Sequence, residues 1–183
     1  MIRGACWALL LGLASACQAA PKPKSPEGNF QVRWSGREPG RMSTGATAGW
    51  CAPRHMLEVR GIQGDTGAAL VLYPAETLTA GVYRVVPPTR AESLAPAAAL
   101  ALRWLTPKTV QGFRGESGTV TLERSRTGQV SGEIKARARS VVDTQRVTVT
   151  GSFRDLMLRL EPTACAAPAR PASAAEPVDT GVH

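Results

Sequence analysis

The sequence predicts an all-β protein, either an antiparallel β-sandwich or a small barrel of about eight to ten strands, with a C-terminal meander. Apolar and polar residues alternate through most of the chain between residues 29 and 165, as expected of strands with one buried face. Turn-forming Gly, Pro and Asp residues recur between these segments. A parallel α/β sheet is disfavoured because its strands are buried on both faces and would not alternate.

The first strands are predicted from alternation and from the turns between them. Residues 63–67 (Gln-Gly-Asp-Thr-Gly) form a turn signal, and Pro87-Pro88 ends a strand because proline donates no ladder hydrogen bond. The alanine-rich segment 97–105 suits a helix, but its larger apolar residues fall at every second position, so we expect a strand. The segments expected as strands in this half are 30–34, 57–60, 68–73, 82–86 and 97–105.

For the C-terminal meander, the sequence predicts a register as well as strands 118–124, 130–140, 146–153 and 156–161. A single alignment places the apolar residues of all four strands on one face, and a slip of one residue would expose them all. The alignment requires a two-residue hairpin at Arg154-Asp155, which lacks the Gly or Asn that such turns prefer. The predicted inner rows are Val120–Ile134–Gly151–Leu158, Leu122–Gly132–Phe153–Leu156, Ala136–Val149–Leu160 and Ala138–Val147.

The first sixteen residues have the pattern of an export signal. Arg3 precedes an apolar run of about a dozen residues, which is within the range of a signal peptide and too short to span a bilayer. The run ends in Leu13-Ala14-Ser15-Ala16-Cys17, which resembles the lipobox of bacterial lipoproteins, although Ala14 stands where that family prefers Leu. This resemblance implies cleavage before Cys17 and acylation of Cys17. Ordinary secretion after a small-x-small cleavage site is the alternative.

The chain divides into four predicted parts: a signal peptide at 1–16, a tether at 17–28, a single β domain at 29–165 and a disordered tail at 166–183. The tether and the tail are rich in Pro and Ala and contain too few large apolar residues to form a core.

Two cysteines are left once the signal is removed and Cys17 is acylated. Cys51 and Cys165 form an even pair in an oxidising compartment, which predicts one disulfide. Two buried free thiols are the alternative.

The charge is basic, with 22 Lys and Arg against 14 Asp and Glu. Outside the cytoplasm, nucleic acid is not expected as a partner, so the surplus favours anionic lipids or polysaccharides, or simply solubility. The meander register gathers basic residues on its outer face and sets Arg146 directly opposite Arg139. Because like charges directly opposite are mildly destabilising, this cluster suggests an anionic ligand. The alternative is a solvated outer face, on which Glu123, Glu133 and Glu161 neutralise much of the positive charge. The predicted anion-binding residues are Lys135, Arg137, Arg139, Arg146 and Arg159.

Asp65-Thr66-Gly67 resembles the active-site triplet of aspartic proteases, in which two close carboxylates act as acid and base. The second copy, Asp179-Thr180-Gly181, lies in the predicted tail, where no strand would hold it. We therefore interpret the first copy as a turn and keep a protease as a distant alternative.

No other motif indicates catalysis. His55 and His183 are the only histidines, and no spacing suits a zinc site or a Ser-His-Asp set. We predict no catalytic residues, no metal and no cofactor. Trp34 and Trp104 are expected in the core. A carrier of a small apolar or anionic ligand, with these tryptophans lining a barrel cavity, is the alternative.

Taken together, the lipobox and the pattern G-x-V-x-G-x-I…V-x-V-x-G-x-F between Gly128 and Phe153 resemble the small, uncharacterised all-β lipoproteins and exported domains of bacteria. The resemblance implies a non-enzymatic binding or structural module at the cell envelope. Gln18 follows Cys17 where inner-membrane retention signals place Asp, which favours the outer membrane.

Overall fold

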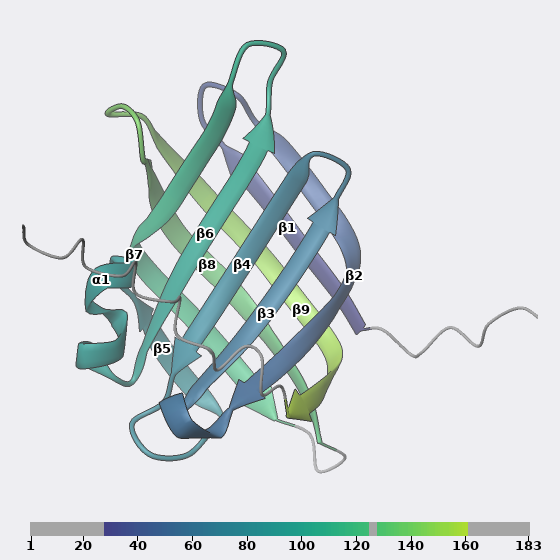
Figure 1. The fold of residues 1–183 in the computed structure, drawn as a ribbon, viewed down its shortest axis with the longest axis vertical. Coiled ribbons are helices and arrows are strands. Elements are labelled where there is room, and N and C mark those ends of the chain that lie inside the picture. The colour runs from purple at the N-terminus through teal and green to yellow at the C-terminus, as the bar shows by residue number, and fades with distance from the viewer. Residues whose placement is uncertain (1–27, 125–127, 161–183) are drawn as a thin grey trace, which may run out of the picture.

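In a computed structural model that describes residues 28–124 and 128–160, nine strands form one mixed sheet that closes in a ring (Figure 1). The all-β prediction is confirmed, and the sheet closes on itself instead of splitting into two layers. The strands are β1 (Gly28–Ser35), β2 (Gly40–Cys51), β3 (Met56–Gln63), β4 (Thr66–Tyr73), β5 (Gly81–Val85), β6 (Ala97–Leu105), β7 (Val110–Arg124), β8 (Gln129–Ser140) and β9 (Arg146–Leu160).

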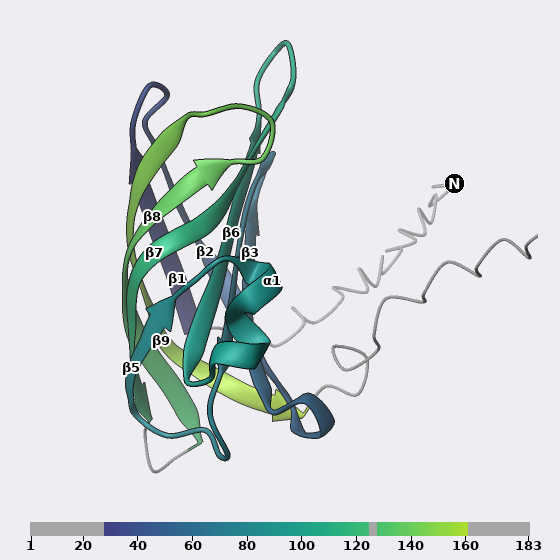
Figure 2. The ribbon, with the colours of Figure 1, turned by 90° about the vertical axis from the view of Figure 1, so that its left-hand side faces the viewer.

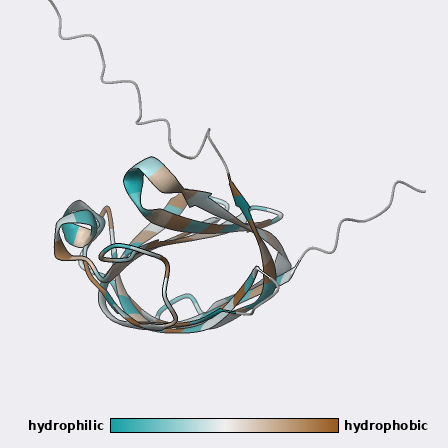
Figure 3. Cartoon of the chain, turned by 90° about the horizontal axis from the view of Figure 1, so that it is seen from below, coloured by the Kyte–Doolittle hydropathy of each residue, from teal (hydrophilic) through white to brown (hydrophobic). Residues whose placement is uncertain are grey.

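The order around the ring is β1-β2-β3-β4-β6-β5-β7-β8-β9, and β9 returns to pair with β1. Most neighbours are antiparallel. The two exceptions are β5, which runs parallel to the start of β6, and the end of β9, which runs parallel to β2. The expected purely antiparallel sheet is therefore corrected to a mixed one. Figure 3 looks into the ring from below and shows the strands enclosing its interior.

Alternate side chains from every strand fill the inside of the ring. At the end that carries the β6–β7 turn, the rings of Trp34 and Trp104 stack with centroids 5.0 Å apart, and Trp104 stacks on Phe113 at 4.9 Å. Both indole N–H groups donate to Glu38, that of Trp34 to the backbone oxygen and that of Trp104 to the carboxylate. These aromatic side chains occupy the space that a carrier cavity between Trp34 and Trp104 would need.

The predicted register of the meander is confirmed between β7, β8 and β9. Ile134 lies opposite Val120 and Gly151, Gly132 lies opposite Leu122 and Phe153, and Ala136 and Ala138 lie opposite Val149 and Val147. The ring of Phe153 passes so close to Gly132 that a Cβ atom there would lie 2.5 Å from Phe153 Cζ.

The predicted hairpin at Arg154-Asp155 is wrong. β9 continues from Arg146 to Leu160 as one strand, and Asp155 is accommodated within it with a φ of 55°. The backbone N–H of Asp155 donates to Ser131 Oγ, beside an irregularity in the β8–β9 register. Residues 156–160 therefore do not fold back on 146–153. Instead β1 pairs with β9, and Phe30 lies opposite Phe153.

The ambiguous segment 97–105 is strand β6, as predicted, with the side chains of Ala98, Leu100, Leu102 and Trp104 buried. Strand β2 and the first half of β7 were not predicted. The helical segments are η1 (Ala52–Arg54), α1 (Pro88–Ala91) and η2 (Glu92–Leu94).

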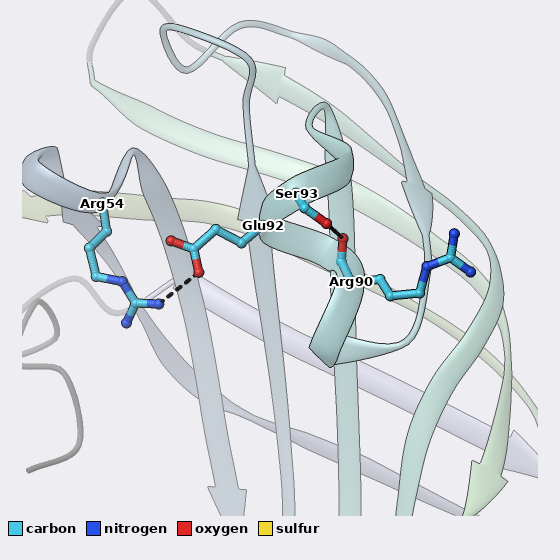
Figure 4. Close-up of polar contacts among 4 residues, drawn as sticks. All are labelled: Arg54, Arg90, Glu92 and Ser93. Carbon is cyan, nitrogen blue, oxygen red and sulfur yellow. Dashed lines mark hydrogen bonds and ion pairs between the residues drawn. The ribbon is translucent and has the colours of Figure 1, made fainter. Parts of the chain in front are cut away.

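Helix α1 lies outside the ring and packs on β6 (Figure 2). Figure 4 shows how the segment is held: Arg54 Nη2 of η1 lies 3.3 Å from Glu92 Oε2, and the hydroxyl of Ser93 donates to the backbone oxygen of Arg90. Burial raises the pKa of the nearby Tyr73, and the charge of Arg54 partly offsets this.

Candidate anion-binding face

The basic side chains predicted on β8 share its outer face. Lys135, Arg137 and Arg139 are exposed, and the residues between them, Ala136 and Ala138, are buried in the ring. Arg146 on β9 lies directly opposite Arg139, as the sequence register predicted. The structure therefore brings together four of the five predicted residues.

A further arginine, missed by the sequence analysis, extends this group onto β7. Arg114 lies directly opposite Arg139, so that Arg114, Arg139 and Arg146 form one cross-strand row on three neighbouring strands, here called the arginine row. The predicted strand starts at residue 118, whereas β7 begins at Val110. The signal that could have found it is the buried Phe113, which continues the apolar alternation upstream of a register shift.

Glu116 is the carboxylate that contacts the arginine row, and a bulge in β7 brings it there. The β7–β8 register shifts between Gly115 and Ser117, so Glu116 has no partner residue on β8. Its Oε2 accepts a hydrogen bond from Arg146 Nε at 3.0 Å. This bond lowers the pKa of Glu116, and the charges of Arg146, Arg139 and Arg137 lower it further. The pKa of Arg146 is raised by the same contact.

The other two members of the row have no such partner. Among residues 28–124 and 128–160, Arg114 and Arg139 form no ion pair, although they lie directly opposite each other. Two like charges in this arrangement repel by a few tenths of a kcal/mol. Within the part of the chain that the structure describes, the face therefore carries two guanidinium groups without an ion-pair partner beside one neutralised arginine.

Arg159 does not belong to the group. Because β9 is one continuous strand, Arg159 lies about 40 Å along it from Arg146 and sits opposite Gly49 of β2. The prediction placed it one strand away from Arg146 on the strength of the hairpin that the structure lacks. Of the predicted residues, Lys135, Arg137, Arg139 and Arg146 therefore share one face, and Arg114 lies beside them.

The remaining sequence candidates are separate from this face. Asp65 is exposed at the tip of the β3–β4 turn, where Gly64 has a φ of +55°, as expected of a tight turn. Its second copy, Asp179, lies outside the described residues. His55 is exposed, and its Nδ1 lies 2.8 Å from the backbone oxygen of Glu76. No cluster of three or more potential metal-ligating side chains occurs in the part of the chain that the structure describes.

Of the cysteines, only Cys51 lies within the described residues, and it is fully buried at the end of β2. Cys17 and Cys165 lie outside them, so both the acylation and the disulfide stay predictions.

Comparison with known proteins finds no matching family model, curated protein or solved structure. None of the helical segments described here has the length and apolar character to cross a bilayer.

Proposed function

We propose that this chain is an exported envelope lipoprotein without catalytic activity, anchored through acylated Cys17, whose β-ring binds an anionic ligand at the arginine row. The anchoring part rests on the export signal and the lipobox, which precede the described residues. The binding part rests on one observation: Arg114 and Arg139 lie directly opposite each other with no carboxylate paired to either among the described residues.

An anion resolves the unfavourable electrostatics of this row. A carboxylate, sulfate or phosphate accepts two parallel hydrogen bonds from one guanidinium group, and such charge-assisted bonds are about twice as strong as neutral ones. Two free guanidinium groups on adjacent strands thus supply both the charge and the donors for one anionic group.

The position of the row relative to the chain's entry point favours a soluble or wall-bound anion. Strand β1 begins at Gly28, and its second residue, Asn29, pairs with Arg154 in the second half of β9. Arg146 is the first residue of β9 and lies at the other end of the ring (Figure 1). A protein held by an acyl group on Cys17 would therefore present the row away from the anchor. This supports a ligand whose anionic group is presented away from the anchoring membrane, on a polysaccharide or on a smaller molecule, with the lipid headgroups of that membrane as the alternative.

Heparin serves as the soluble anionic polymer for a test of the row. We expect the full chain to bind immobilised heparin and to elute at a salt concentration that falls clearly in the double variant Arg114→Gln/Arg139→Gln, because direct ion pairs are lost. Arg159→Gln with Lys108→Gln is the matched control: it removes the same charge from exposed positions away from the row. Equal losses in both double variants would reduce the binding to net charge and contradict the proposal.

Anchoring is tested separately by mass spectrometry of the protein from membrane fractions. The expected product begins at Cys17 and carries acyl chains, and Cys17→Ala should abolish the acylation, whereas Cys6→Ala in the signal should not. Recovery of the intact chain from cytosol with Met1 still present would overturn the assignment to the envelope.

A further inference from the structure

Beside the arginine row, the outer surface of the ring is hollowed. A groove of about 330 Å³ lies over β3, β4, β6 and β7. Its floor is formed where Ala69 and Ala101 lie opposite each other, and where Gly67 and Gly112 flank Arg103 in the next row. The small residues Ala69, Ala101 and Gly112 leave the hollow, and the side chain of Arg103 lies over Gly67.

The groove has apolar sides. Ile62 on β3 and Val141, which follows β8, both line it, and they are 63% and 51% exposed. Exposed β-branched side chains of this size are unfavourable in water unless something covers them. Ile62 lies opposite Gly67, and the backbone N–H of Val141 donates to the backbone oxygen of Gly112, so these two apolar side chains lie at the two ends of the row that carries Arg103.

The chain covers the neighbouring part of the same face but leaves the groove open. Further down β6, Ala97 and Ala99 are buried where α1 packs on the strand, and they are only 1% and 7% exposed. Ala101, two residues beyond Ala99, is exposed. The outer face of β6 is therefore covered by the helix in its first half and uncovered in the groove.

The groove also carries positive charge. Arg103 and Arg114 both line it, and neither forms an ion pair with any described residue. Arg114 also lines a second hollow of about 310 Å³, which Arg139, Pro87 and the carboxylate-bearing Glu116 border; Glu116 is ion-paired with Arg146. The guanidinium group of Arg114 thus belongs both to the arginine row and to the apolar groove.

We propose that the ligand is an amphiphilic anion: its carboxylate or phosphate binds Arg114 and Arg139, and its apolar part lies in the groove over Ala69 and Ala101. This inference rests on the proposed anion-binding function and narrows its ligand class. A site with a volume in the small-molecule range, an apolar floor and a few convergent charged groups has the general composition of ligand sites. Free fatty acids and lipids with a phosphate ester headgroup share this chemistry.

The test uses a photoreactive fatty acid that carries a diazirine on its chain, added to membranes that contain the full chain. The probe is compared with the corresponding fatty alcohol, which lacks the charge, and labelled peptides are located by mass spectrometry. Competition with unlabelled dodecanoate or with dodecyl phosphate distinguishes a free acid from a phosphate headgroup as the preferred ligand.

Three variants and a control separate the two parts of the site. Ala101→Phe fills the groove without changing charge, and Arg114→Gln and Arg139→Gln each remove an anion donor. Thr121→Phe places the same bulky side chain at another exposed outward position of β7, away from the groove. We expect acid labelling on β4, β6 and β7 to fall about tenfold in the first three, in line with the loss of a charge-assisted hydrogen bond or of the apolar site, and to be unchanged in Thr121→Phe.

The inference is overturned if the alcohol labels the groove as well as the acid does, if labelling falls elsewhere on the chain, or if Ala101→Phe labels normally. In those cases heparin binding that still depends on Arg114 and Arg139 would leave the broader anion-binding proposal standing. If the row variant and the control variant lose heparin binding equally, the broader proposal is contradicted as well. A further variant lacks residues 161–183. If the full chain is not labelled and this variant is, the tail occupies the groove in place of a ligand, and the inference is overturned.

Discussion

Leu160, the last residue of β9, lies opposite Trp50 of β2 in the parallel pairing that joins these two strands. The next residue of β2 is Cys51, whose side chain is fully buried. Cys165 follows Leu160 by five residues, a span of at most about 18 Å when extended. A five-residue segment that starts at Leu160 is therefore long enough to reach Cys51, which is compatible with a disulfide between Cys51 and Cys165.

We predict a Cys51–Cys165 disulfide that closes a loop of about 114 residues and stabilises the domain by up to about 4–5 kcal/mol, an upper bound from chain entropy. Cys165→Ser should lower the free energy of unfolding measured with urea, and reductant should lower that of the wild type to a similar value. Cys165→Ser is the more informative variant, because Cys51→Ser also places a hydroxyl in a buried site. A wild type whose stability and non-reducing peptide map do not respond to reductant would contradict the bridge.

The meander register was predictable because each strand there alternates without interruption. Gly132 and Gly151 fit the rows only as neighbours of bulky residues or of a close backbone, and the structure puts them in such places. The arrangement of β1 could not be predicted, since nothing local in Phe30 or its neighbours specifies pairing with a strand more than a hundred residues away. Long-range pairing is decided by ring closure and not by propensity.

Part of the candidate site was predictable from the register of the meander, and part was not. Arg139 and Arg146 are close in sequence and joined by one turn, so their pairing followed from the register. Arg114 was missed because the β7 bulge at Glu116 breaks the period-2 pattern just downstream of it. Strand β2 was missed because its glycines and small polar residues read as a loop, although Met42, Ala46 and Ala48 point into the core.

Because Phe153 packs closely on Gly132, adding one methyl group at Gly132 should clearly destabilise the folded protein. A Cβ on Gly132 would lie 2.3 Å from the backbone oxygen of Thr121 and 2.5 Å from Phe153 Cζ, so both must shift. Gly132→Ala should therefore destabilise the protein by about 1–3 kcal/mol in urea unfolding. Gly67→Ala is the matched control, because its Cβ would meet nothing closer than the flexible Arg103 side chain at 3.4 Å, and it should change stability by less than about 0.5 kcal/mol. Similar stabilities for the two variants would show that the Phe153 ring is not fixed over Gly132.

The ion pair between Glu116 and Arg146 predicts how stability responds to acid. The hydrogen bond from Arg146, with the nearby charges of Arg139 and Arg137, lowers the pKa of Glu116 below its ordinary value of 4.5. Folding therefore favours the ionised carboxylate. This stabilisation is complete above the unfolded-state pKa and is lost as the pH falls from there through the folded-state pKa.

Glu116→Gln should accordingly be less stable than the wild type at pH 7, and the gap should close as the pH falls below about 4.5. The measurement is the free energy of unfolding in urea between pH 3 and pH 7, at low and at high salt, because screening should shrink the gap at neutral pH. Glu123→Gln, which removes an exposed carboxylate elsewhere on the outer face of β7, should show a much smaller dependence on pH. A difference between Glu116→Gln and the wild type that stays constant down to pH 3 would mean that the bulge at Glu116 matters for backbone geometry and not for its charge among the arginines.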